Sequence, residues 1–452
     1  MLKKNEIYQA QITGMTAEGS GVCRIDGMAV FVPMTAVGDK LRVKIVKVLK
    51  SYAFGIIEEL TEPAQERCEP DCPVFRQCGG CVFRHVTYEE ELRYKAEQVR
   101  DAFTRIGRLS PEFEEIAGSE GRTAYRNKAQ YPVAMQDGKL VCGFYARHSH
   151  RVIPFTGCLL QPEIFTQILD YLLPALQNAG ISAYDERTNT GLLRHIYLRR
   201  GYHSGEIALC LVVRKSIRRK VQYLLADLQS RFPELVSITE NINPEKTNVI
   251  LGKTLNVLAG KPVISDRMCG NAIEISPQSF YQVNTAQAER LYGIAKEYAQ
   301  LSGGELLLDL YCGAGTIGLS MADRAGELIG AEVIPEAVEN ARENALRNGI
   351  ANAQFHCGDA GEIAQKLKGE GTAPDVVVLD PPRKGCDIPC IDAVAAMSPK
   401  RVVMISCNPS TAARDAALFA ERGYAVEKVR AVDLFPGTGH VECVVLMSRD
   451  KA

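Results

Sequence analysis

From Gly304 onward the sequence alternates short apolar runs with helical segments, and this alternation constrains the fold more than any other feature. Strand-like runs are predicted at residues 305–310, 327–332, 353–357, 375–379 and 401–406. A helical segment follows each run, which is typical of a parallel sheet covered by helices. Two more strand-like runs, at 425–432 and 441–448, end the chain with no helix between them. A doubly wound α/β domain is therefore predicted over residues 266–452.

A glycine-rich segment, DLYCGAGTIG at residues 309–318, ends the first strand and opens the next helix. Glycine lets backbone amides approach a ligand at a helix N-terminus, so this turn is predicted to bind a cofactor. Gly313, Gly315 and Gly318 also have the spacing of the dinucleotide fingerprint. Glu332 ends the next strand, where a ribose-binding carboxylate belongs. On these residues alone, NAD is an alternative ligand.

Three further features favour S-adenosylmethionine over NAD. Asp359 follows the third strand, where a carboxylate can reach an adenine amino group. The segment DPPR, residues 380–383, follows the fourth strand. The terminal strand pair without a helix distinguishes the methyltransferase version of this sheet. We therefore predict a Rossmann-like methyltransferase domain.

Cys407, in the segment SCNP at residues 406–409, directly follows the fifth strand. Ligands of doubly wound sheets bind at the carboxyl ends of strands, so Cys407 and Asp380 are expected around one crevice. Uracil C5 is a poor nucleophile, but a thiolate that adds to C6 creates an enolate whose C5 attacks a methyl sulfonium. The C5 proton must then leave. Glu442, a carboxylate within an apolar run, is the predicted base, and His440 is the alternative.

The N-terminal region has a different pattern, with short strand-like runs separated by glycines. These runs are at residues 9–15, 21–25, 28–32, 40–49 and 54–59, and Asp26-Gly27 is typical of a hairpin turn. They predict an OB-like barrel over residues 1–60, a fold that often binds nucleic acid; a purely structural barrel is the alternative. A loop is predicted at 61–82 and a helix at 88–106.

The cysteines are unevenly placed, with four of the fifteen between Cys68 and Cys81. In a reducing compartment, clustered thiols indicate metal ligands or catalysts rather than disulfides. Cys72, Cys78 and Cys81 have the density of a metal site. Cys68 could complete a four-thiolate zinc site within the loop.

The middle of the chain is basic, although the net charge is only −1. Residues 187–220 contain nine Lys or Arg and one acid, and residues 122–151 contain six against one. This excess predicts contacts to RNA, whose target base must be unstacked to expose C5 and C6. The candidate contacts are Arg122, Arg126, Lys128, Arg194, Arg199 and Arg200, interleaved with Tyr125, Tyr131, Tyr197 and Tyr202.

The segments DPPR (380–383), SCNP (406–409) and GHVE (439–442) together resemble those of the bacterial RNA uracil-5 methyltransferase family. Within that family the chain most resembles the 23S rRNA branch, which carries an N-terminal TRAM domain and an iron–sulfur cluster. The resemblance implies that Cys407 is the nucleophile and Glu442 the base. It implies contacts to S-adenosylmethionine from Gln282, Tyr311, Thr316, Glu332, Asp359 and Asp380.

The same resemblance implies a 4Fe-4S cluster held by Cys72, Cys78, Cys81 and the distant Cys158, with zinc as the alternative. It assigns residues 1–60 to the TRAM domain, 61–265 to a central mixed α/β domain with the cluster, and 266–452 to the methyltransferase domain. It also implies that helix 88–106 packs on the last of these. The fold class is thus multidomain α/β.

The expected activity is methylation of uracil C5 in 23S rRNA, through a covalent bond from Cys407 to C6 of a flipped-out uridine. The alternatives are a tRNA uracil-5 methyltransferase, an amino-methylating enzyme, and a non-catalytic RNA-binding iron–sulfur protein. Amino-methylating enzymes usually place an aromatic residue after Pro-Pro, where this chain has Arg383. No apolar run has the roughly 18–20 residues of a membrane span, and no signal peptide is recognisable. We expect a cytoplasmic monomer.

Overall fold

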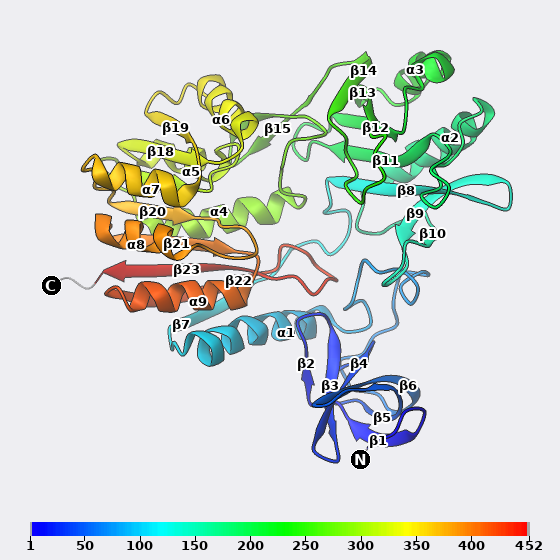
Figure 1. Cartoon of the computed structure of the whole chain (residues 1–452), viewed down its shortest axis with the longest axis horizontal. Helices are drawn as coiled ribbons and strands as arrows, with labels where there is room; N and C mark the ends of the chain where they lie inside the picture. The colour runs from blue at the N-terminus through cyan, green and yellow to red at the C-terminus, as the bar shows by residue number, and fades with distance from the viewer. Residues whose placement is uncertain (1, 450–452) are drawn as a thin grey trace.

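The computed structural model describes residues 2–449. Three large sheets follow one another along the chain and separate clearly in space (Figure 1). The six-stranded N-terminal sheet lies at the bottom of the view, the seven-stranded central sheet at the upper right, and the eight-stranded C-terminal sheet at the left. Within the described residues no helix combines the length and apolar character needed to cross a membrane.

The N-terminal sheet has the order β1-β5-β6-β4-β3-β2. Its strands are β1 (Ile7–Gln11), β2 (Gly14–Met15), β3 (Ser20–Ile25), β4 (Met28–Pro33), β5 (Lys40–Val48) and β6 (Tyr52–Glu62). Alternate residues such as Val30, Val43 and Ile45 fill its interior. The run predicted at 9–15 is two strands, because the chain changes partner there from β5 to β3.

Residues 63–87 contain no helix or strand, in agreement with the predicted loop. The loop is held by charged pairs instead of by a sheet. Arg67 donates to both oxygens of the buried Asp39 at 2.7 Å, and Arg84 donates to both oxygens of Asp71 at 2.6 Å.

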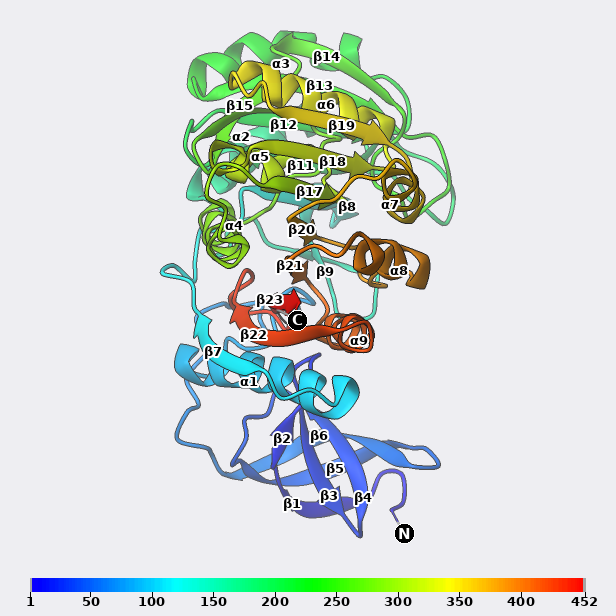
Figure 2. The ribbon, with the colours of Figure 1, turned by 90° about the vertical axis from the view of Figure 1, so that its left-hand side faces the viewer.

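The chain next passes under the C-terminal sheet before it enters the central one. Helix α1 (Tyr88–Asp101) starts at the cap Thr87 and continues as a π-helical turn, η1 (Ala102–Gly107), which packs on α9. Strand β7 (Glu112–Ala117) then pairs in parallel with β22 and becomes the edge of the eight-stranded sheet. Figure 2 shows α1 and β7 beside α9 and β22.

The central sheet has the order β10-β9-β8-β11-β12-β13-β14. Its strands are β8 (Lys128–Gln136), β9 (Lys139–Tyr145), β10 (Val152–Pro154), β11 (Leu193–Arg200), β12 (Ile207–Val213), β13 (Leu235–Ile242) and β14 (Thr254–Gly260). Helices α2 (Glu163–Asn178) and α3 (Arg218–Arg231) bury their leucines against it. A short hairpin, β15 (Ile264–Met268) and β16 (Asn271–Ile275), leads into the last region.

The C-terminal sheet has the order β19-β18-β17-β20-β21-β23-β22-β7. Its further strands are β17 (Leu306–Leu310), β18 (Glu327–Glu332), β19 (Ala353–Cys357), β20 (Val376–Leu379), β21 (Arg401–Ser406), β22 (Tyr424–Val432) and β23 (Glu442–Arg449). Helices cover both faces: α4 (Thr285–Ala299), α5 (Thr316–Met321), α6 (Pro335–Arg347), α7 (Ala360–Gly369), α8 (Ile388–Met397) and α9 (Pro409–Ala420) (Figure 2).

Neighbouring residues of the central strands of this sheet belong to different cores. Leu307 packs on one face and Leu308 on the other, as expected for a sheet that is buried on both sides. Strand β23 inserts antiparallel between β21 and β22. Its first residue therefore lies at the edge where the parallel strands end.

Candidate active site

A cavity of about 1640 Å³ opens along the carboxyl edge of the eight-stranded sheet. The loops that follow β16, β17, β18, β19, β20, β21 and β22 contribute to its wall. All eight side chains predicted for catalysis and cofactor binding line it: Gln282, Tyr311, Thr316, Glu332, Asp359, Asp380, Cys407 and Glu442. The structure thus brings together residues that are up to 160 positions apart in the sequence.

The glycine-rich turn is shaped around a buried carboxylate, Asp309. Gly315 has φ +79°, a conformation that glycine adopts without strain. The Gly318 amide donates to Asp309 Oδ2 at 2.8 Å, and a Cβ on Gly318 would come within 2.7 Å of that oxygen. Burial raises the pKa of Asp309 to about 7. Sequence reasoning gave Asp309 no role, although an acid inside the apolar run LLLDL is a recognisable signal.

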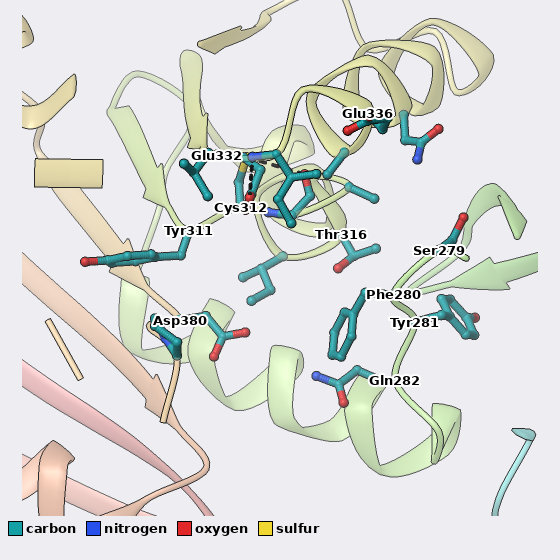
Figure 3. Close-up of a pocket in the computed structure, with 18 of the residues that line it drawn as sticks. Ser279, Phe280, Tyr281, Gln282, Tyr311, Cys312, Thr316, Glu332, Glu336 and Asp380 are labelled. Atoms are coloured by element: carbon teal, nitrogen blue, oxygen red, sulfur yellow. Dashed lines mark hydrogen bonds between the residues drawn. The ribbon is translucent and has the colours of Figure 1, made fainter. Parts of the chain in front are cut away.

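Two carboxylates at neighbouring strand ends are fixed by backbone amides. Glu332 accepts from Gly313 N at 3.1 Å and from Ile334 N at 2.9 Å. Asp359 is the N-cap of α7, and its Oδ1 accepts from the first amides of that helix. Figure 3 shows Glu332, Thr316 and Asp380 arranged around the cavity. This end of the cavity presents acceptors suited to hydroxyl and amino groups.

The opposite wall is the segment Ser276–Asn284, which carries Gln282 and the largely exposed Phe280 toward the cavity (Figure 3). Side chains of the central sheet hold this segment. Arg199 donates to the carbonyls of Ser276 and Ser279 at 3.1 and 3.0 Å. Asn127 donates to the Gln282 carbonyl at 2.8 Å. Neither support was foreseen, because both are long-range contacts to backbone oxygens.

Part of the predicted RNA surface is instead internal. Arg199 is only 1% exposed, and Arg194 is buried against the carbonyls of residues 243, 245 and 247. Tyr125, Tyr131 and Tyr197 are also buried. The prediction that these five side chains contact RNA is therefore wrong, because they lie in the interior of the protein. Arg126 and Lys128 do line the cavity.

The chemical end of the cavity lies where β21 and β23 meet. Cys407 is half-buried directly after β21, and Glu442, at 7% exposure, is the first residue of β23. Burial, reinforced by the negative charge of Asp380, raises the pKa of Glu442 to about 8. Burial and the charge of Glu442 also raise the pKa of the Cys407 thiol, while Arg383 opposes that shift.

Arg383 and His440 complete this end, and sequence reasoning had not placed Arg383 in the site. An Arg383 nitrogen lies 3.3 Å from His440 Nδ1. The Arg383 carbonyl accepts from the Asn408 side chain at 3.1 Å, which ties it to the turn after Cys407. Burial and the charge of Arg383 lower the pKa of His440, so the imidazole is neutral and can accept at Nδ1.

The four cysteines implied as cluster ligands are electrostatic neighbours. Burial raises the pKa of Cys81, with further contributions from Cys158 and Cys78, to about 12. Burial also raises the pKa of Cys158, with contributions from Cys78 and Cys72. The Cys68 thiol instead donates to the Arg84 carbonyl. Across residues 2–449 no three metal-ligating side chains are already arranged around one point.

A doubly wound sheet with a glycine-rich turn binds its ligand at this edge, and the antiparallel β23 between β21 and β22 is the feature expected of the S-adenosylmethionine-dependent methyltransferase class. Residues 87–450 match the tRNA (Uracil-5-)-methyltransferase family, and residues 2–57 match the TRAM domain. The chain therefore belongs to the tRNA (uracil-5-)-methyltransferase family. It is an RNA uracil-5 methyltransferase with an N-terminal TRAM domain.

Individual relatives match this protein along the whole chain. An RNA methyltransferase of Bacillus cereus is 42% identical over 449 residues, which are 99% of this chain and 98% of that protein. One of Halalkalibacterium halodurans is 40% identical, with coverage of 99% and 98%. The solved tRNA (uracil-54, C5)-methyltransferase of Pyrococcus abyssi, in complex with S-adenosyl-L-homocysteine, is 25% identical with a TM-score of 0.78. It matches 97% of this chain and 100% of its own.

Proposed function

We propose that this enzyme methylates C5 of a uridine in 23S rRNA through a covalent bond between Cys407 and C6. One observation carries the proposal: Cys407 and Glu442 share a cavity with the residues expected to hold the cofactor. A binding module does not require a buried carboxylate next to a thiol. The non-catalytic alternative would leave this pair without a purpose.

Cys407 attacks first. Its Sγ adds to C6 as a thiolate, and the nearby Arg383 guanidinium favours that charged form. S-adenosylmethionine would supply the electrophilic methyl group that C5 takes up, with S-adenosylhomocysteine as the leaving group. Glu442 then removes the C5 proton, the C5–C6 double bond re-forms, and the thiolate leaves. A pKa of about 8 suits Glu442 to this step, because a base works best when its pKa lies near the working pH.

The cofactor is proposed to lie between the two walls of the cavity. Glu332 would bind the ribose hydroxyls, and Asp359 the adenine amino group. Gln282, Tyr311, Thr316 and Asp380 would line the rest of the path toward Cys407. The amide contacts of Glu332 and Asp359 support these roles, since they fix each carboxylate before a ligand arrives.

The RNA target is proposed from the resemblance to the 23S rRNA branch, and tRNA is the alternative that the Pyrococcus abyssi relative represents. Mapping 5-methyluridine in both RNAs from a strain that lacks this gene distinguishes them. We expect one or more uridines of 23S rRNA to lose the methyl group. Loss in tRNA alone would transfer the assignment to tRNA.

We also propose that Cys72, Cys78, Cys81 and Cys158 hold a 4Fe-4S cluster, with zinc as the alternative. The mutual effect of these thiols on their pKa values fits a shared site, since a metal takes the thiolate form. Protein purified without oxygen should be brown. Cys158→Ser should bleach it and Cys68→Ser should not, whereas colourless protein with stoichiometric zinc would exclude the cluster.

A further inference from the structure

Two cations at the entrance to β8, Arg126 and Lys128, line the cavity, and Arg126 also opposes the burial-raised pKa values of the Cys81 and Cys158 thiols. Tyr125, Asn127 and Ala129 are buried, so the alternation of the chain turns Arg126 and Lys128 to the other side. Neither cation forms an ion pair with any carboxylate in the part of the chain that the structure describes. The Nε of Arg126 is buried without a hydrogen-bond acceptor.

The backbone that carries this pair is fixed on both sides. The Asn127 amide donates to the Val283 carbonyl at 2.7 Å, and its side chain donates to the Gln282 carbonyl at 2.8 Å. The Arg126 amide donates to the Leu160 carbonyl at 2.9 Å. The two cations are therefore presented by a braced segment between the Gln282 wall and the Cys158 turn, and not by a mobile surface loop.

The charge around Lys128 is uncompensated. Burial and the charges of two other cations, Arg199 and Arg126, lower the pKa of Lys128 to about 8. A partly buried ammonium with only cations nearby is unfavourable unless an anion is bound. The charges around Lys128 are therefore those of an anion-binding site.

The pair lies toward the catalytic end of the cavity. The Arg126 guanidinium is 5.9 Å from the centroid of the Phe435 ring, and its charge contributes to the lowered pKa of His440. Phe435 and His440 line the cavity together with Glu442. An anion bound by Arg126 would thus lie close to a nucleobase that reaches Cys407.

We propose that Arg126 and Lys128 bind a phosphodiester of the RNA, the one attached to the uridine whose base enters the cavity. This inference rests on the proposed uridine substrate. A flipped nucleotide brings its phosphate to the mouth of the site, and Lys and Arg are the residues that neutralise it. The pair would fix the position of the nucleotide, while Cys407 and Glu442 carry out the chemistry.

The test uses the full-length enzyme and a short oligouridylate as probe. Lys128→Gln and Arg126→Gln should each weaken binding about tenfold or more. Each should also reduce the slope of log affinity against log salt by about 0.7. Lys128→Arg should restore both quantities. Lys139→Gln, at the exposed far end of the β8–β9 hairpin, is the matched control and should change neither.

Two further measurements distinguish an RNA phosphate from an anionic group of the cofactor as the ligand of this pair. On an oligouridylate with neutral methylphosphonate linkages, wild type and Lys128→Gln should bind equally. Lys128→Gln and Arg126→Gln should not change the affinity for S-adenosylmethionine, measured by calorimetry. An unchanged salt slope, no oligouridylate binding by wild type, or weakened cofactor binding with intact RNA binding would overturn the phosphate site. Failure of wild type to form an adduct with 5-fluorouridine RNA would instead overturn the covalent mechanism, so the two failures are distinguishable.

Discussion

The carboxyl edge of the eight-stranded sheet and the basic middle of the chain both contain polar residues at high density, but they use them in opposite ways. At the edge, Cys407 is the first residue after β21 and Glu442 is the first residue of β23, and both line the cavity. In the middle, Arg194 and Arg199 lie within β11 and bond to backbone carbonyls. Polar residues thus serve as chemical groups at a strand end and as structural supports within a strand.

The largest effect should come from the two residues of the catalytic pair, which act at different steps. Cys407→Ala should abolish turnover and covalent RNA attachment, because it removes the thiol that is proposed to add to C6. Glu442→Gln should still add Cys407 and accept the methyl group, and then stall before the C5 proton leaves. A denaturing gel with methyl-labelled cofactor detects the stalled protein–RNA adduct.

A 5-fluorouridine substrate provides the control for this experiment. It should trap the wild-type enzyme at the same stage, since fluorine cannot leave as a cation. Normal turnover by Glu442→Gln would assign the base to His440 or to water. If wild type forms no adduct with the fluorinated RNA, covalent catalysis is wrong.

A buried charge cluster between α1 and the loop after β22 should have the next largest effect, on stability. Lys95 of α1 donates to Glu91 and Asp433 at 2.7 Å each, and all three side chains are at most 1% exposed. Glu91 also accepts from the Gly437 amide at 2.6 Å, five residues before Glu442. Lys95→Met should lower the free energy of unfolding by about 3–5 kcal/mol, because it leaves the buried Asp433 without its cation and Glu91 with only the longer contact to Arg122 at 3.6 Å.

Arg105→Gln, in the turn η1 that continues this helix, is the matched control, since Arg105 and its partner Asp101 are both exposed and its loss should lower stability by about 0–1 kcal/mol. Chemical denaturation of both variants measures the difference. Equal destabilisation would mean that burial does not determine how much each cation contributes to stability. It would contradict the contrast between internal and exposed charges.

The sequence patterns predict the C-terminal sheet well, because each strand there is an apolar run and each functional residue lies at its end. The predicted runs 327–332, 353–357 and 401–406 coincide with β18, β19 and β21. Local pattern could not reveal that β7 joins this sheet, nor that Arg199 and Asn127 hold the Gln282 segment. Those contacts join residues that are far apart in the chain, and a buried arginine has the same sequence signal as a surface one.

The pH dependence of stability tests the burial of the catalytic base. The pKa of Glu442 is raised from 4.5 to about 8, so its protonated form is favoured by folding. Its contribution to stability is complete below about pH 4.5 and is lost as the pH rises through about 8. Glu442→Gln removes this titration. It should therefore unfold like wild type near pH 4.5 and be more stable by about 2–4 kcal/mol at pH 9.

Thermal melting across this pH range measures the difference between the two proteins. Asp309, whose pKa is raised to about 7 by burial, remains in both proteins and cancels on subtraction. Asp380 interacts with Glu442, so the difference reports the titration of Glu442 together with its effect on Asp380. A difference in stability that is independent of pH would show that Glu442 is ionised in the folded protein.

The smallest effect concerns a residue at the strand edge that also serves as a support. Glu332 accepts from the amides of Gly313 and Ile334, and its proposed ligand is the pair of ribose hydroxyls. Glu332→Ala should weaken S-adenosylmethionine binding by about 1–3 kcal/mol, the range for charge-assisted hydrogen bonds. Glu339→Ala, on the exposed face of α6, should leave the affinity unchanged.

Calorimetric titration with cofactor and with adenine separates the two functions of Glu332. If only the ribose contact is lost, adenine affinity should stay constant, whereas collapse of the glycine turn should weaken both ligands. Unchanged cofactor affinity would remove Glu332 from the site and leave it as a support alone, like Arg199 in the central sheet.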